Sequence, residues 1–194
     1  MEIGAIKAVQ DRLKTTKIEE SKGASLVFCW DTHLTKIKGR NVLFIVNASN
    51  RYTIAMTDIE PRNWNYYTMY IRSVIHGVMQ EMGYSEDQIG QYFKMSGDTT
   101  VTKTHGRKSV GGINRMVMDA QYFGKKLEKE AKYQWELSEY LNRDICQPEG
   151  FDAYGYPSEL FKLDMERLGI ATKRKPAKVI DIAQYIENNR GTND

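Results

Sequence analysis

Apolar residues near the N-terminus recur at spacings of three and four, at Ile3, Ile6, Val9 and Leu13. This spacing puts them on one face of a helix, so we predict an amphipathic helix over residues 3–15. After a charged connector, four short runs rich in apolar and β-branched residues predict strands. These runs are residues 26–30, 33–37, 41–47 and 51–57.

The third and fourth of these runs predict how the strands pair. Residues 41–47 are apolar without alternation, which is typical of a strand buried on both faces. Residues 51–57 alternate instead, with Tyr52, Ile54 and Met56 on one side. The short polar segments between the runs predict tight turns, so neighbouring strands should pair as an antiparallel meander.

The strongest helical pattern follows Pro61 and runs from Trp64 to Met82, with apolar residues at spacings of three and four. A stripe of this length predicts a helix that lies on the sheet and ends at Gly83. A Thr-rich run over residues 99–104 predicts another strand. Further helices are predicted over residues 85–95, 110–120, 123–141, 158–168 and 179–188.

Together these elements predict an α+β fold. We expect an antiparallel sheet of four to five strands, with the helix over residues 64–82 packed on one face. Residues 1–125 would form this α+β domain. Residues 126–194 would form a helical C-terminal extension packed on it, with a basic linker at residues 173–176.

The composition narrows the class of protein. A chain of 194 residues that is 41% hydrophobic is long enough to bury a proper core. Its two cysteines, Cys29 and Cys146, form no CxxC motif, so we expect free thiols in a reducing, cytoplasmic location. No leader or long apolar run indicates a membrane partner. No zinc-binding spacing, P-loop or GxGxxG motif occurs, so no metal or cofactor is expected.

Candidate chemistry concentrates in a basic segment. Residues 94–115 carry five Lys or Arg against one Asp or Glu. Part of this charge lies where a helix is predicted to begin, and the free N–H groups and dipole of a helix N-terminus attract anions. Ser109 could cap that helix, and the pair Gly111–Gly112 could permit close approach of a ligand. A solvated basic turn without function is the alternative.

A phosphate or nucleic acid is the ligand that this segment would hold. Its predicted binding residues are Lys103, Thr104, Arg107, Lys108, Ser109 and Arg115.

Metal-independent RNA cleavage is an alternative function, because RNA supplies its own nucleophile and needs only a base, an acid and cations. His105 or His33 could be the base, with Lys103 on the scissile phosphate. Asp31 and His33 lie on the same face of a predicted strand and could also form an acid/base pair, although Asp31 could simply cap the strand end. Cations that bind phosphate without any chemistry would look the same in sequence.

The second half of the chain suggests a third function. Residues 116–172 carry seven Lys or Arg against eleven Asp or Glu. Acidic helices of this kind could mimic nucleic acid and bind a protein that normally holds it.

Several strings of the chain resemble a bacterial, phage and plasmid family that is described as a domain of unknown function, over about residues 1–125. The strings are Leu26–Leu34, Arg40–Asn47, Asn50–Tyr52 and Val101–Thr104, together with Arg107 and Asn114. The chain departs from the family pattern where Trp30-Asp31-Thr32-His33 replaces Trp-His-Ala-Asn, and where Ala48 replaces an Asp. The resemblance carries over no activity.

By type of protein alone, the chain is also similar to the small proteins of phages and plasmids that include type II anti-CRISPR proteins. That similarity implies an inhibitor that acts on RNA or on a ribonucleoprotein effector complex, either by binding the complex or by promoting loss of its guide RNA. RNA or such a complex is therefore the expected partner.

Overall fold

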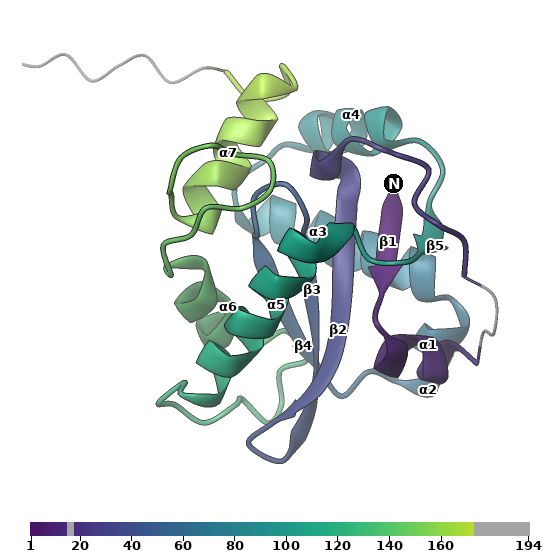
Figure 1. Cartoon of the computed structure of the whole chain (residues 1–194), viewed down its shortest axis with the longest axis vertical. Coiled ribbons are helices and arrows are strands. Elements are labelled where there is room, and N and C mark those ends of the chain that lie inside the picture. The colour runs from purple at the N-terminus through teal and green to yellow at the C-terminus, as the bar shows by residue number, and fades with distance from the viewer. Residues whose placement is uncertain (15–17, 173–194) are drawn as a thin grey trace, which may run out of the picture.

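A computed structural model describes residues 1–14 and 18–172 and shows an α+β fold built on a mixed five-stranded sheet (Figure 1). The strand order is β4-β3-β2-β1-β5. The strands are β1 (Glu2–Ala5), β2 (Cys29–Ile37), β3 (Arg40–Asn47), β4 (Thr53–Thr57) and β5 (Thr100–Thr102).

Seven α-helices accompany the sheet in the described residues. They are α1 (Lys7–Leu13), α2 (Pro61–Asn65), α3 (Tyr67–Glu81), α4 (Glu86–Ser96), α5 (Gly106–Gln121), α6 (Trp135–Asn142) and α7 (Pro157–Arg167), and a 3-10 turn, Leu26–Phe28, precedes β2. None of these helices is long and apolar enough to cross a membrane.

The predicted meander is confirmed for β2, β3 and β4, which pair in antiparallel register. Lys38 and Gly39 turn the chain between β2 and β3, both with positive φ, as a tight hairpin turn requires. The apolar residues of β3 are buried on both faces, as their lack of alternation predicted.

The helix predicted over residues 3–15 is confirmed as α1 at residues 7–13, but its first residues were predicted wrongly. Residues 2–5 form a strand, not a helix, and β1 pairs in parallel with both β2 and β5. Ile3 and Ala5 face one core, while Glu2 and Gly4 face the other side of the sheet. A segment as short as residues 2–5 is compatible both with the alternation of a strand and with the spacing of a helix. Backbone hydrogen bonds to two neighbouring strands decide between the periods, and the sheet is therefore mixed, not antiparallel.

Other boundaries also differ from the prediction. Residues 29–37 form one strand where two were expected, and the helical stripe after Pro61 is divided at Tyr66. The helix predicted over residues 123–141 is confirmed only from Trp135, as α6, because α5 ends at Gln121 and the chain runs irregularly between the two helices. The predicted linker at 173–176 and the helix at 179–188 lie outside the described residues.

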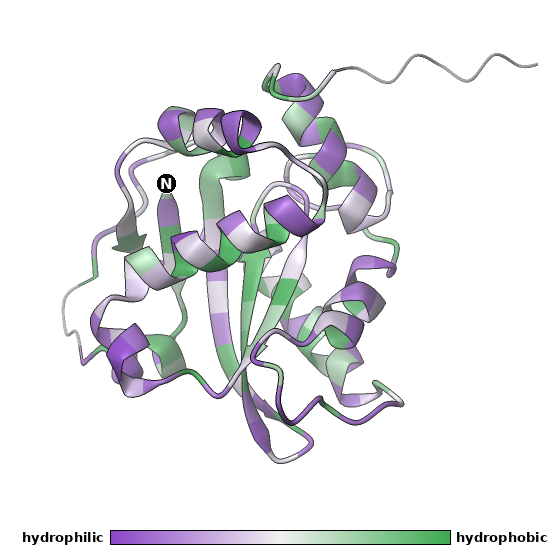
Figure 2. Ribbon diagram, turned by 180° about the vertical axis from the view of Figure 1, so that it is seen from behind, coloured by the Kyte–Doolittle hydropathy of each residue, from purple (hydrophilic) through white to green (hydrophobic). Residues whose placement is uncertain are grey.

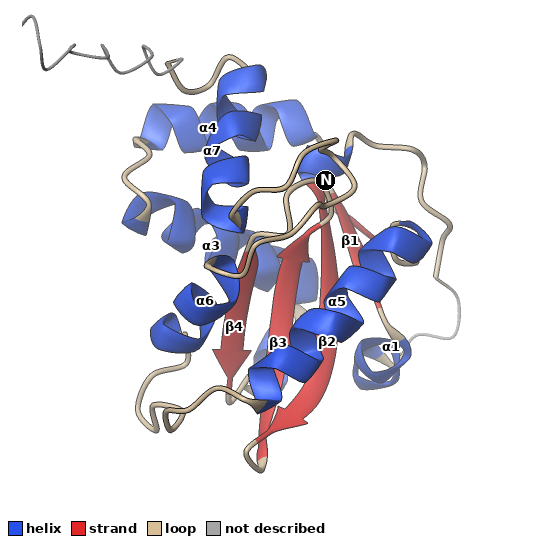
Figure 3. Ribbon diagram, turned by 60° about the vertical axis from the view of Figure 1, so that its left-hand side comes forward, coloured by secondary structure: helices blue, strands red, loops and turns tan. Residues whose placement is uncertain are grey.

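Helices cover both faces of the sheet, although a covering helix had been assigned to only one face. On the face seen in Figure 2, α3 covers the sheet, and its Ile71 and Ile75 belong to the same buried core as Trp30 and Ile45. On the other face, α5 and α6 lie over β2, β3 and β4 (Figure 3). This second core holds Phe44 of β3 against apolar residues of both helices. The start of α5 is thereby held beside β1 and β2.

Candidate functional site

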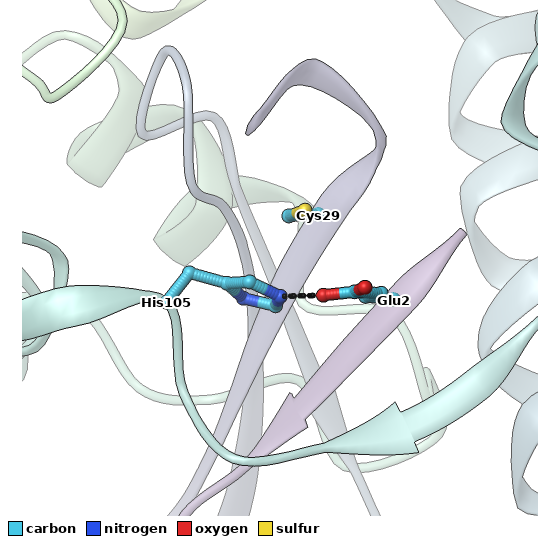
Figure 4. Close-up of side chains that lie close together, drawn as sticks. All are labelled: Glu2, Cys29 and His105. Carbon is cyan, nitrogen blue, oxygen red and sulfur yellow. Dashed lines mark hydrogen bonds and ion pairs between the residues drawn. The ribbon is translucent and has the colours of Figure 1, made fainter. Parts of the chain in front are cut away.

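The site lies where β1, β2 and the start of α5 meet. The parallel register places Glu2 beside Cys29, and Gly4 beside Asp31. Alternate residues of a strand share a face, so Glu2, Cys29 and Asp31 all point to the α5 side of the sheet. His105, the residue before α5, reaches over them, and its imidazole points at the Glu2 carboxylate with Cys29 close by (Figure 4).

The His105 side chain lies between two carboxylates and is only 3% exposed. Its Nδ1 is 2.7 Å from Asp31 Oδ1, and its Nε2 is 3.0 Å from Glu2 Oε2. An imidazolium donates from both nitrogens and so satisfies both carboxylates. Burial lowers the pKa of His105, but its interactions with Asp31 and Cys29 outweigh burial and raise the pKa to about 10. His105 is therefore positively charged at neutral pH.

Asp31 ties β2 to the first turn of α5. Its Oδ2 accepts from the Ser109 hydroxyl at 2.6 Å, and its Oδ1 also accepts from the His105 backbone N–H at 3.2 Å. Gly4 leaves the room for this carboxylate, because a Cβ at that position would lie 1.9 Å from Asp31 Oδ1. Asp31 is thus buried in mid-strand and is not a strand-end cap.

Glu2 is held from the other side by the segment over residues 18–25. The Ser21 hydroxyl donates to Glu2 Oε2 at 2.6 Å, and the Lys22 backbone N–H donates to Oε1 at 2.8 Å. Burial raises the pKa of Glu2, but these hydrogen bonds, with the contribution of His105, outweigh burial and leave it below its ordinary value. Glu2 is therefore a carboxylate at neutral pH.

Cys29 brings a thiol into the same cluster. The Cys29 Sγ, a carboxylate oxygen of Glu2 and a ring nitrogen of His105 all lie within 4.8 Å of one another, and all three residues are buried. Both cysteines are free thiols. Cys146 is buried elsewhere, where its backbone pairs with Gly155 in an isolated antiparallel β-bridge. We call the four residues Glu2, Cys29, Asp31 and His105 the buried cluster.

The predicted binding residues are dispersed around the start of α5. Lys103 forms an ion pair with Glu20, and Lys108 Nζ donates to the Pro148 carbonyl at 3.3 Å. Ser109 is buried on Asp31, and Thr104 is half-buried.

Arg107 and Arg115 are exposed on α5 and contact no carboxylate within the described part of the chain. The structure therefore offers two free cations on the outer face of the helix and does not gather all the predicted residues at one point.

The predicted catalytic pairing of Asp31 with His33 does not form. Asp31 bonds to His105 instead, while His33 is half-buried in β2 and burial lowers its pKa. Glu2 and Cys29 were not among the predicted site residues, because a helix over residues 3–15 is incompatible with the parallel register that brings them together. The alternation of Glu2, Ile3, Gly4 and Ala5 is the only signal that could have suggested a strand.

Comparison with known proteins gives a family and no close relative. No curated protein and no solved structure matches the chain. One family matches residues 2–160, which include the whole buried cluster and extend beyond the residue 125 expected from the resemblance. The chain belongs to this family, which is described as Domain of unknown function (DUF6933).

Proposed function

We propose that the chain binds RNA through the outer face of α5. The observation that carries this proposal is the pair of exposed arginines, Arg107 and Arg115, whose guanidinium groups form no ion pair among the described residues; Arg115 lies beside a hollow that Asp119 and Asp144 also line. They stand two turns apart on one side of the helix, or about 12 Å along its axis. Cations at this separation can contact separate phosphates of one strand.

The rest of this face suits a flexible polyanion. Gly111 lies between the two arginines, and no atom lies within 4 Å of the place that its Cβ would take, so a strand can approach the helix backbone. Tyr122, directly after α5, is 80% exposed, and its αR backbone continues the helical spacing, which puts it on the same side. Exposed aromatic rings stack on bases without regard to sequence. The α5 face, defined as Arg107, Gly111, Arg115 and Tyr122, thus combines cations, open backbone and a stacking ring.

The geometry favours binding over cleavage. Both ring nitrogens of His105 are engaged by buried carboxylates, and its raised pKa leaves no free base at neutral pH. Lys103, the expected partner of the scissile phosphate, is paired with Glu20. We therefore assign the task of fixing the start of α5 to the contacts of Asp31 with His105 and Ser109, and we expect RNA to be recovered intact after incubation in EDTA.

A narrower form of the proposal is that the bound RNA belongs to a ribonucleoprotein effector complex, and that the chain is an inhibitor from a mobile element. The support for this narrower form is the type of protein alone. Binding through acidic helices over residues 116–172 is the competing proposal. This competing proposal predicts that substitution of Arg107 and Arg115 leaves binding of the partner unchanged.

A double variant tests the proposal. Arg107→Gln with Arg115→Gln removes both free cations, and fluorescence anisotropy with a labelled single-stranded RNA measures the dissociation constant over a range of salt. Each lost phosphate contact should lower the log–log salt slope by roughly one, so the double variant should lose about two from the slope and bind at least about tenfold more weakly.

The matched control is Lys7→Gln with Lys94→Gln, because both lysines are exposed on helices of the other core and the net charge changes equally. It should keep the slope of the unmodified protein. Equal affinity and slope for the arginine variant and the unmodified protein would refute the α5 face as the binding surface.

A further inference from the structure

We propose that Glu2, Cys29 and His105 form a binding site for a zinc-type divalent transition ion, with Asp31 supporting His105. The site lies beneath the 18–25 segment and on the opposite side of the helix start from the α5 face. It uses none of the residues of the proposed RNA surface, so the two proposals stand or fall separately. The three ligands come from β1, β2 and the start of α5, which is why no metal-binding spacing appears in the sequence.

The distances suit an ion of this kind. The three ligand atoms lie within 4.8 Å of one another. Zinc bonds of about 2.0–2.3 Å in a tetrahedron place ligand atoms roughly 3.3–3.8 Å apart. The present separation of 3.0 Å between Glu2 Oε2 and His105 Nε2 is slightly shorter than that. The upper limit of 4.8 Å exceeds the tetrahedral separation by about 1 Å, so side-chain movements of up to about this size would bring the three groups around the ion.

The donor set selects the class of ion. A thiolate and an imidazole favour Zn²⁺, Co²⁺ or Fe²⁺ over Mg²⁺ and Ca²⁺, which prefer oxygen ligands alone. A carboxylate is an ordinary third ligand for zinc. Three protein ligands leave a fourth position for water or a small ligand, although the 18–25 segment covers this side of the cluster.

The supporting residues already hold the ligands in place. Metal-bound histidines almost always donate their other ring N–H to a carboxylate or carbonyl, and His105 Nδ1 lies 2.7 Å from Asp31 Oδ1. Asp31 is in turn fixed by Ser109. Glu2 is oriented by the Ser21 hydroxyl and the Lys22 N–H. A network that only capped a helix would need the Asp31 contacts and neither Glu2 nor the thiol.

The charge of the cluster also accommodates the ion. The Cys29 Sγ–H donates to the Ser25 carbonyl at 3.4 Å, and His105 Nε2 lies 3.0 Å from Glu2 Oε2. A Zn²⁺ ion would take the place of the protons on Cys29 Sγ and His105 Nε2, so its binding should release protons. The carboxylate of Glu2 and the thiolate would then offset the charge of the ion.

Cobalt titration of the full chain, first freed of metal with EDTA, tests the site. We expect one equivalent of Co²⁺ to bind and to produce a thiolate-to-cobalt charge-transfer band in the near ultraviolet, which one equivalent of Zn²⁺ then removes. Cys29→Ser should abolish the band. Cys146→Ser, the matched control at the other buried thiol, should retain it.

Two further variants test the support of His105 and the independence of the metal site from the RNA surface. Asp31→Asn, which alters the support of His105 without removing a ligand, should weaken Zn²⁺ binding about 10–100-fold. The Arg107→Gln, Arg115→Gln variant should bind Co²⁺ as the unmodified protein does, whatever its affinity for RNA. No charge-transfer band in the unmodified protein, or a band that survives Cys29→Ser, would overturn the proposal even if a variant fails to fold.

Discussion

His105 is the residue on which most of the structure at the start of α5 depends. Its imidazolium lies between two buried carboxylates and neutralises the charge of one of them. The backbone N–H of His105 donates to the same Asp31 carboxylate as the ring does. A buried ion pair adds little net stability when intact, but removing one partner leaves a buried charge uncompensated and is strongly destabilising. The stability of the structure at the start of α5 therefore depends on the protonation state of His105.

The pH dependence of stability follows from that state. The pKa of His105 is raised from its ordinary value of 6.5 to about 10, so its contribution is complete below about pH 6.5 and is lost as pH rises toward 10. The free energy of unfolding should fall across this range by at most about 1.4 kcal/mol per pH unit. Glu2, whose pKa is lowered, acts oppositely, and its contribution is lost only as the solution becomes acidic.

Urea unfolding of the metal-free protein between pH 6.5 and 9.5 measures this loss. The His105→Gln variant lacks the imidazole and should therefore lose the part of the pH dependence that His105 contributes. The same slope in both proteins would mean that His105 is not the group responsible.

Among the elements, the sequence predicted best those whose partners are close in the chain. The β2–β3–β4 meander depends on short turns, and α4 on the capping box between Ser85 and Gln88, so local patterns were sufficient. The position of β1 depends on pairing with residues far along the chain, at Cys29 and Thr100. The buried cluster could not be predicted for the same reason. The basic segment and His105 were found, but the residues that enclose His105 were not.

A substitution in β1 tests that placement. Gly4→Ala would put a methyl group 1.9 Å from Asp31 Oδ1 and 3.0 Å from the Thr104 Cα, so the carboxylate must leave His105 or the strand must move. We expect a loss of about 2–4 kcal/mol in the free energy of unfolding, measured with denaturant.

The matched control is Gly77→Ala in α3, where no atom lies within 4 Å of the added Cβ. Because alanine favours a helix over glycine, this change should be neutral or stabilise by up to about 1 kcal/mol. Equal effects of the two substitutions would contradict the close packing of β1 against Asp31.

In the whole molecule, the two proposed sites share the start of α5 but use opposite sides of it. The inner side, with His105 and Ser109, joins the helix to β2 through Asp31. The outer side presents Arg107 and Arg115 to solvent. The contacts on the inner side hold the start of α5 in place and thereby position Arg107 on the outer side. Loss of the buried cluster should therefore weaken RNA binding indirectly, because the start of α5 would no longer be held.

Photo-crosslinking of the full chain to a single-stranded RNA, with the attached peptides identified by mass spectrometry, tests the central claim most directly because it reports where the RNA lies. We expect crosslinks at Tyr122 and at peptides from α5, and we expect the Arg107→Gln, Arg115→Gln variant to lose most of them while Lys7→Gln, Lys94→Gln keeps them. Crosslinks confined to other surfaces, or a yield that the arginine substitutions leave unchanged, would contradict RNA binding by the α5 face.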